Sequence, residues 1–323
     1  MGLIRFLLAC AVVLGHSPGW GITPDKFASG FIQPYYAVQA FFVISGFYMA
    51  LIHEKYASKK WVFYVNRYSR LIVSYWIVAL LTFSLSRYLE APFPQFKEGT
   101  PIVPLIANLS LFGADTVQFL NQVGWILVPQ GWSLGSELWF YLIVPFIATR
   151  TRTILLLLVA SFCVRLAIVN SDLPFFPWQQ RFFPAEIMFF LIGMLSFVSR
   201  DFLGKLALPL AVLLVLFGAT PYSIWFSLGL AGVLFLLLPA VFSATRYSKI
   251  DRVIGEFCYP IYLWHVFVGE FIRPQNAWVL LAISILLSLP LVLFVEKPME
   301  RWREKRLKRS GTAASIQRLP EGI

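Results

Sequence analysis

The sequence predicts an all-α protein that crosses a membrane several times. Of its 323 residues, 59% are hydrophobic and 13% are charged, whereas soluble domains are about half apolar and about a quarter charged. The hydrophobic residues also gather in runs that approach the roughly 20 residues of a membrane-spanning helix. Ordinary numbers of glycine and proline, together with 17% aromatic residues, exclude a disordered or collagen-like chain.

Ten apolar runs, bounded by charged residues or by glycine and proline, are expected to form transmembrane helices. They lie near residues 3–19, 34–53, 68–88, 132–149, 153–170, 185–199, 206–219, 223–243, 254–272 and 277–295. With a cytoplasmic N-terminus, this count places 21 basic residues inside, five outside and one, Arg165, within a span. The bias obeys the positive-inside rule, so both termini are expected in the cytoplasm.

Three segments do not fit the simple pattern of spans. The first run resembles a signal peptide with a lipoprotein box at Cys10, but only four apolar residues separate Arg5 from Cys10, so we favour an uncleaved span. Residues 101–130 are broken by proline, glycine and aspartate, which indicates an interfacial or re-entrant segment on the outer side. Residues 1–300 therefore form the membrane domain, and residues 301–323 are expected to be a disordered basic cytoplasmic tail.

Composition also excludes some ligands. The net charge of +11 is assigned to cytoplasmic loops and not to nucleic-acid binding. The three cysteines lie in apolar runs without metal-ligand spacing, so neither a disulfide framework nor a metal site is expected. The basic run 297–309 is expected to contact surface lipids.

Charged side chains inside spans are costly and mark candidate functional sites. Arg5 and His16 are eleven residues apart, which amounts to about 16 Å of rise and three turns plus about 20°, so they share one face of the first helix. That face predicts a passage that a long ligand enters from the Arg5 side. A snorkelling arginine and a merely hydrogen-bonded histidine are the alternative.

A polar stripe runs along the fourth span, where Ser133, Glu137 and Tyr141 recur every four residues. Glu137 lies at about the depth of His16, and a carboxylate beside an imidazole fixes its tautomer and stabilises its protonated form. We therefore expect Glu137 to partner His16, with a purely structural glutamate as the alternative.

Two further pairs stand at the ends of other spans. Tyr262 and His265 face the same way and are expected either to orient an acceptor or to anchor the helix at the interface. Arg67 and Arg70 lie one turn apart and could bind phosphates together with Arg5, unless they serve only as cytoplasmic anchors. The remaining outer-half charges, Arg165, Glu186 and Glu270, are expected to close ion pairs.

Several separated motifs resemble those of the acyltransferase-3 family of integral membrane acyltransferases. They follow the family's order: Arg5 to His16 (R-x10-H), residues 41–47 (FFVISGF), Arg67 with Arg70, residues 132–137 (WSLGSE), residues 259–265 (YPIYLWH) and residues 296–298 (EKP). The resemblance covers residues 3–300. Any one of these motifs alone would be weak, but their shared order makes coincidence improbable.

The resemblance implies transfer of an acyl group, usually acetyl, from cytoplasmic acyl-CoA to a hydroxyl of an extracytoplasmic glycan or glycolipid. Residue by residue, it makes His16 the main catalytic residue and Glu137 its partner, and it assigns Arg5, Arg67 and Arg70 to coenzyme A. Without an SGNH esterase-like domain, this chain resembles the stand-alone exopolysaccharide and O-antigen acetylases of bacterial inner membranes. It is then expected to pass acyl groups directly to the acceptor or to another protein.

Four residues complete the expected site as acceptor or pocket residues: Ser133, Tyr141, Tyr262 and His265. Membrane lipids and polysaccharide-synthesis proteins are the other expected partners. The competing interpretation is a transporter or flippase for a lipid-linked sugar, because intramembrane histidine, glutamate and arginine also build transport paths. A structural subunit of a polysaccharide synthase is a third interpretation.

Overall fold

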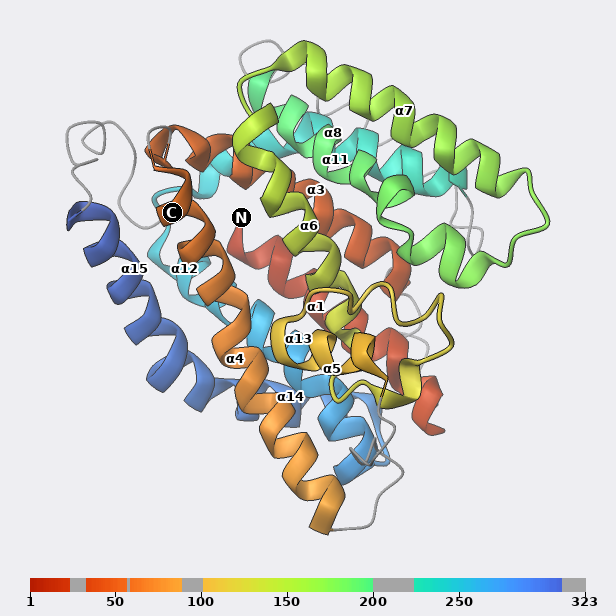
Figure 1. Cartoon of the computed structure of the whole chain (residues 1–323). Coiled ribbons are helices and arrows are strands. Elements are labelled where there is room, and N and C mark those ends of the chain that lie inside the picture. Colours follow the sequence, from red (N-terminus) through yellow and green to blue (C-terminus); the bar gives the residue numbers. More distant parts are fainter. Residues whose placement is uncertain (24–32, 57–58, 89–100, 200–223, 310–323) are drawn as a thin grey trace.

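The computed structural model of the chain describes residues 1–23, 33–56, 59–88, 101–199 and 224–309. These residues form helices and turns without a β-strand, which confirms the all-α prediction (Figure 1). The α-helices are α1 (Gly2–His16), α3 (Pro34–His53), α4 (Lys60–Tyr88), α5 (Ile102–Ser110), α6 (Trp132–Ile147), α7 (Thr151–Val169), α8 (Phe183–Val198), α11 (Ile224–Thr245), α12 (Lys249–Glu256), α13 (Cys258–Phe267), α14 (Ala277–Leu291) and α15 (Lys297–Arg309).

Seven helical stretches within the described residues are long and apolar enough to span a membrane. They cover residues 2–20, 34–53, 60–88, 151–169, 175–198, 224–245 and 277–309, and they match seven of the ten predicted runs. The runs near 132–149 and 254–272 are helical but shorter, because α6 has 16 residues and α13 has ten before a π-helical turn, η6 (Val268–Ile272). The run near 206–219 lies outside the described residues. The segment 101–130 contains only the nine-residue α5 and short turns, as expected for a segment that does not cross.

Helix α3 lies at the centre of the bundle and contacts α1, α6, α8 and α11 (Figure 1). Its backbone meets that of α8 with nothing between them: a Cβ on Gly46 would lie 1.8 Å from the Phe190 carbonyl oxygen, and a Cβ on Gly193 would lie 1.8 Å from that of Val43. Small residues at such positions let membrane helices approach closely, which gives a structural reason for the glycine of the FFVISGF motif.

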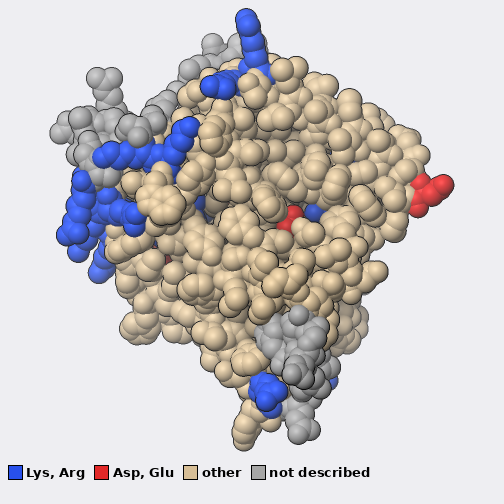
Figure 2. Space-filling model, viewed as in Figure 1, with Lys and Arg blue, Asp and Glu red and all other residues tan. Residues whose placement is uncertain are grey.

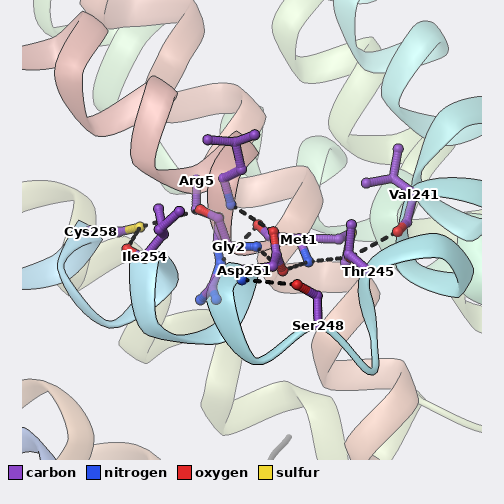
Figure 3. A network of polar contacts seen from close by, with 10 residues as sticks. Met1, Gly2, Arg5, Val241, Thr245, Ser248, Asp251, Ile254 and Cys258 are labelled. Atoms are coloured by element: carbon purple, nitrogen blue, oxygen red, sulfur yellow. Dashed lines mark hydrogen bonds and ion pairs between the residues drawn. The ribbon is translucent and has the colours of Figure 1, made fainter.

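The start of α1 is held by α12 (Figure 3). The carboxylate of Asp251 accepts hydrogen bonds from the backbone N–H groups of Gly2 (2.7 Å) and Leu3 (2.9 Å), which have no partner within their own helix. The amino group of Met1 donates to the same carboxylate at 2.6 Å. Asp251 thus caps α1 from another helix and fixes where Arg5 stands.

Helix α15 corrects the expected disorder of the tail. Residues 301–309 of the predicted tail are helical, and its remaining residues, 310–323, lie outside the described part of the chain. Glu304 and Lys308 are spaced as a helix-stabilising pair, and the backbone carbonyl of Arg303 accepts a hydrogen bond from Asn66 of α4 (3.4 Å). Basic side chains of α15 lie in the blue cluster at the left of Figure 2, whereas the other charged side chains on this face stand apart from one another at its top, bottom, right edge and centre.

Candidate functional site

A cavity of about 280 Å³ lies inside the bundle, among α1, α3, α4, α6, α12, α13 and α15. We refer to it as the central cavity. Six cationic side chains line it, Arg5, Arg67, Arg70, Arg252, Lys297 and Arg303, and four carboxylates lie among the lining residues, Glu137, Glu256, Glu296 and Glu300. We call the part of the wall that holds the six cations its cationic part. Another part is formed by Ser133 and Tyr262. We name the two ends of α1 the Arg5 end and the His16 end.

The three arginines predicted to bind coenzyme A all line the central cavity. Arg5 lies over the ring of Tyr48, with its guanidinium carbon 5.4 Å from the ring centre. It also lies against Gly255, where a Cβ would come within 2.7 Å of its Nη2 atom. Arg70 comes within electrostatic range of the carboxylates of Glu137 and Glu296. The cavity therefore joins cations from separate helices at one place.

Glu137 faces the same cavity, and its carboxylate is held by two hydroxyl groups. Ser45 donates to its Oε1 atom at 2.7 Å, and Tyr141 donates to the same atom at 2.6 Å. The predicted polar stripe of α6 is thus real, since Ser133, Glu137 and Tyr141 all line the cavity. The serine of the FFVISGF motif orients the glutamate of the WSLGSE motif.

Ser133 and Tyr262 form a polar contact across the cavity wall. Their hydroxyl oxygens are 2.8 Å apart, and the Tyr262 hydroxyl also donates to the carbonyl of Gln130 at 2.8 Å. The ring of Tyr262 lies 5.5 Å from that of His265, measured between centroids. Tyr262, a residue of the cavity wall, therefore lies directly beside His265.

His16 and His265 form a hydrogen-bonded pair at the His16 end. Nδ1 of His16 lies 3.0 Å from Nε2 of His265, and the rings are nearly parallel, with an angle of 6°. Nδ1 of His265 lies 2.7 Å from the backbone carbonyl oxygen of Tyr262. A carbonyl can only accept, so Nδ1 of His265 carries the proton of a neutral ring and its Nε2 accepts. His16 must then donate through Nδ1, which leaves its Nε2 unprotonated and able to act as a base.

This arrangement corrects the expected partnership of His16 and Glu137. No hydrogen bond joins these two side chains, both of which belong to the described residues; Glu137 is bonded to Ser45 and Tyr141 instead. The physical reason is helix adjacency: α1 packs against α3, α12, α13 and α14, whereas α6 packs against α3, α4 and α8. The prediction rested on depth alone, which does not determine which helices are neighbours. The group that fixes the tautomer of His16 is His265, for which the sequence predicts either a role toward the acceptor or one as an anchor of its helix.

Two of the three outer-half charges pair as expected. Arg165 and Glu186 form a buried ion pair, with Nη1 and Oε1 2.6 Å apart and each residue only 1% exposed. Glu270 makes no ion pair with any described residue. It accepts a hydrogen bond from the indole of Trp20 at 2.9 Å, and the Trp20 ring stands edge-on to His265.

Several residues of the cavity wall had no role in the predicted site, although Glu296 and Lys297 belong to the EKP motif. Lys297 and Arg303 belong to the basic run that we expected to contact lipids, yet both line the cavity. Glu296 also lines it and accepts a hydrogen bond from Ser74 at 2.5 Å. Residues 296, 300 and 303 are spaced so that they share one face of a helix, which could have indicated a polar face toward the cavity. The many neighbouring charged residues made this spacing hard to recognise.

Comparison with known proteins connects this arrangement to a family. The chain is 23% identical over 302 residues to "Exopolysaccharide production protein ExoZ" of Rhizobium meliloti, covering 85% of this chain and 92% of that protein. It is 26% identical over 320 residues to "O-acetyltransferase OatA" of Staphylococcus aureus, covering 82% of this chain but only 52% of that protein. No solved structure matches. The family model described as "Acyltransferase domain" matches residues 1–297, so the chain belongs to the acyltransferase-3 family.

Proposed function

We propose that this acyltransferase moves an acetyl group from acyl-CoA, bound in the central cavity, to a hydroxyl of an extracytoplasmic glycan or glycolipid. The Arg5 end faces the cytoplasm of a bacterium and the His16 end faces outward across the inner membrane. One observation carries the proposal: a single cavity connects six cationic side chains with the Ser133–Tyr262 contact, and the His16–His265 pair lies directly beyond that contact.

The cationic part of the wall suits the phosphates of coenzyme A. Arginine guanidinium groups bind phosphate oxygens through paired, charge-assisted hydrogen bonds. Arg67 is 9% exposed, and its Nε atom is buried without a hydrogen-bond partner among the described residues, so it has donor capacity left for a ligand. The volume of about 280 Å³ is close to the lower limit of ligand pockets, roughly 300 Å³, and suits the narrow pantetheine arm better than a whole nucleotide.

His16 is the proposed general base. Its unprotonated Nε2 takes the proton of the acceptor hydroxyl as the hydroxyl oxygen attacks the thioester carbonyl carbon. The C–S bond of the resulting tetrahedral intermediate then breaks, and the coenzyme A thiolate takes the proton back from His16. A covalent variant, in which an acyl-histidine or acyl-serine forms first, uses the same base and the same donor.

The acceptor is proposed from the chemistry of the site and from the names of the relatives. The histidine pair lies at the end of α1 away from the cationic wall, so donor and acceptor approach from opposite sides. One relative bears a name that refers to exopolysaccharide production and the other is named an O-acetyltransferase, which supports an envelope carbohydrate as acceptor. Proteins of polysaccharide synthesis and membrane lipids are the proposed neighbours.

The test uses inverted membrane vesicles that contain the protein and its native envelope glycan. Acetyl-CoA labelled in the acetyl group is added to the exposed cytoplasmic face, and label in the glycan is measured. We expect incorporation by the wild type and by His53→Ala, a matched control at a histidine outside the cavity wall, and none by His16→Ala at equal expression. Incorporation by His16→Ala at the wild-type rate would overturn the assignment of His16.

A further inference from the structure

Arg181 lies between the π-helical turn η5 (Phe175–Gln179) and α8, and two aromatic rings hold its guanidinium. The guanidinium carbon is 4.8 Å from the centre of the Trp132 ring and 4.2 Å from that of Phe176. Such stacking fixes the plane of a guanidinium while leaving its N–H groups free to donate. Trp132, the first residue of the WSLGSE motif, thus helps to hold the Arg181 guanidinium in place.

Arg181 has no anionic partner among the residues that the structure describes. Its Nε atom is buried and makes no hydrogen bond, as is also true of Arg165 on α7, but Arg165 forms an ion pair with Glu186 at 2.6 Å and Arg181 forms none among the described residues. Leaving a cation unpaired in an apolar surrounding costs free energy, unlike the closed ion pair of Arg165. Its surroundings therefore leave the guanidinium available to an anion that is absent from the resting protein.

The position of Arg181 indicates which anion that is. The guanidinium lies on the ring of Trp132, and the next residue, Ser133, has its hydroxyl 2.8 Å from that of Tyr262, whose ring lies 5.5 Å from that of His265. Tyr262 lines the central cavity, and Trp132, on which the guanidinium lies, directly precedes the cavity residue Ser133. Arg181 thus lies beside Trp132, next to the part of the cavity wall that contacts the histidine pair through Tyr262. A thioester that reaches His16 from the cavity must bring its carbonyl oxygen to this junction.

We infer that Arg181 is the electrostatic catalytic residue of the transfer, donating hydrogen bonds to the oxyanion of the tetrahedral intermediate. The inference rests on the proposed function. The acceptor oxygen bonds to the carbonyl carbon while its proton passes to Nε2 of His16, and the electron pair of the C=O bond moves to the oxygen facing Arg181. That pair then re-forms C=O as the C–S bond breaks, and the thiolate leaves with the proton from His16.

The experiment compares Arg181→Gln and Arg181→Lys with the matched control Arg87→Gln, an exposed arginine at the end of α4. Purified full-length protein is given acetyl-CoA and glycan extracted from the envelope of the host cell, and thiol release is followed. Removing one oxyanion donor lowers kcat by about 10²–10³-fold. We expect that loss in Arg181→Gln, a smaller loss in Arg181→Lys, an unchanged half-saturating acetyl-CoA concentration, and wild-type kinetics in Arg87→Gln.

Three outcomes would overturn the inference. The first is a wild-type kcat in folded Arg181→Gln, and the second is a loss that disappears at high acetyl-CoA concentration. The third is a loss that vanishes when the carboxylates of the glycan have been converted to amides, because Arg181 would then recognise an anionic acceptor. Activity that persists in His16→Ala would instead contradict the proposed function, so the two failures are distinguishable. Arg181→Lys keeps the test valid if Arg181→Gln does not fold.

Discussion

Nδ1 of His16 lies 3.0 Å from Nε2 of His265, and this contact joins the end of α1 to α13. Because the Tyr262 carbonyl fixes the proton of His265 on Nδ1, the chain of hydrogen bonds runs from His16 through His265 to the backbone. The second histidine does for the first what a carboxylate does in many other active sites, but without adding a negative charge.

We predict that His265→Phe lowers kcat by about 10–100-fold, the usual effect of removing a group that orients a functional histidine. Phenylalanine cannot accept the Nδ1 proton of His16, whereas the amide oxygen of His265→Gln can, so the glutamine variant should recover part of the rate. Transfer of labelled acetyl groups at saturating acetyl-CoA measures both. His53→Gln is the control, and equal rates in the phenylalanine and glutamine variants would contradict an orienting role.

Much of this arrangement was predictable from the sequence, because it follows from local periodicity. The apolar runs marked the helices, and the four-residue spacing of Ser133, Glu137 and Tyr141 marked a polar face that does line the cavity. Arg5 and His16 were placed on one helix, and they do stand at its two ends. Each of these inferences needs only the geometry of a single helix.

What could not be predicted depends on which helices are neighbours. A predicted depth for Glu137 says nothing about rotation or adjacency of helices, and α6 turns this carboxylate toward Ser45 of α3. Arg181 carries no spacing signal at all, because its partners, Trp132 and Phe176, lie on separate segments. The basic run of α15 hid Arg303 among charges that the positive-inside rule already explained.

The cationic wall of the central cavity predicts a difference between two arginines of one helix. Arg303 lines the cavity, whereas Arg301 is exposed on the outside of α15. A hydrogen bond to a charged group contributes about 1.5–3 kcal/mol, so Arg303→Ala should raise the half-saturating acetyl-CoA concentration at least about tenfold. Arg301→Ala should leave it unchanged. If both variants changed the half-saturating acetyl-CoA concentration equally, the basic residues of α15 would be assigned to contact with surface lipids instead.

We predict that the buried carboxyl group of Asp115 makes the free energy of unfolding depend on pH. It is 4% exposed, and burial raises the pKa of its carboxyl from 3.8 to about 6. The folded state then binds more protons than the unfolded state between these values, so the free energy of unfolding falls as pH rises through that interval. The shift of roughly 2 units corresponds to about 3 kcal/mol at most.

Replacing Asp115 by asparagine removes this cost while keeping an acceptor for the indole N–H of Trp139, which donates at 3.3 Å. We expect Asp115→Asn to unfold at a higher temperature than the wild type at pH 8, with the difference shrinking toward pH 4. Thermal unfolding in detergent at several pH values measures it. Asp172→Asn, at an exposed aspartate, should show no such trend, and a constant difference at all pH values would assign the effect to packing.

Gly46, at the contact between α3 and α8, and Gly232 of α11 should respond differently to replacement by alanine. A methyl group on Gly46 would lie 1.8 Å from the Phe190 carbonyl oxygen, a backbone atom that cannot rotate away, whereas one on Gly232 of α11 would meet nothing within 4 Å. Overpacking of this kind costs about 1–3 kcal/mol or more, while alanine in an open helical position stabilises by up to about 1 kcal/mol relative to glycine. Gly46→Ala should therefore lower the unfolding temperature and Gly232→Ala should not.

Gly46 directly follows Ser45, whose hydroxyl holds the carboxylate of Glu137, so Gly46→Ala should also weaken acetyl-CoA binding. Normal stability and donor binding in Gly46→Ala would show that the two helices can separate without disturbing the cavity.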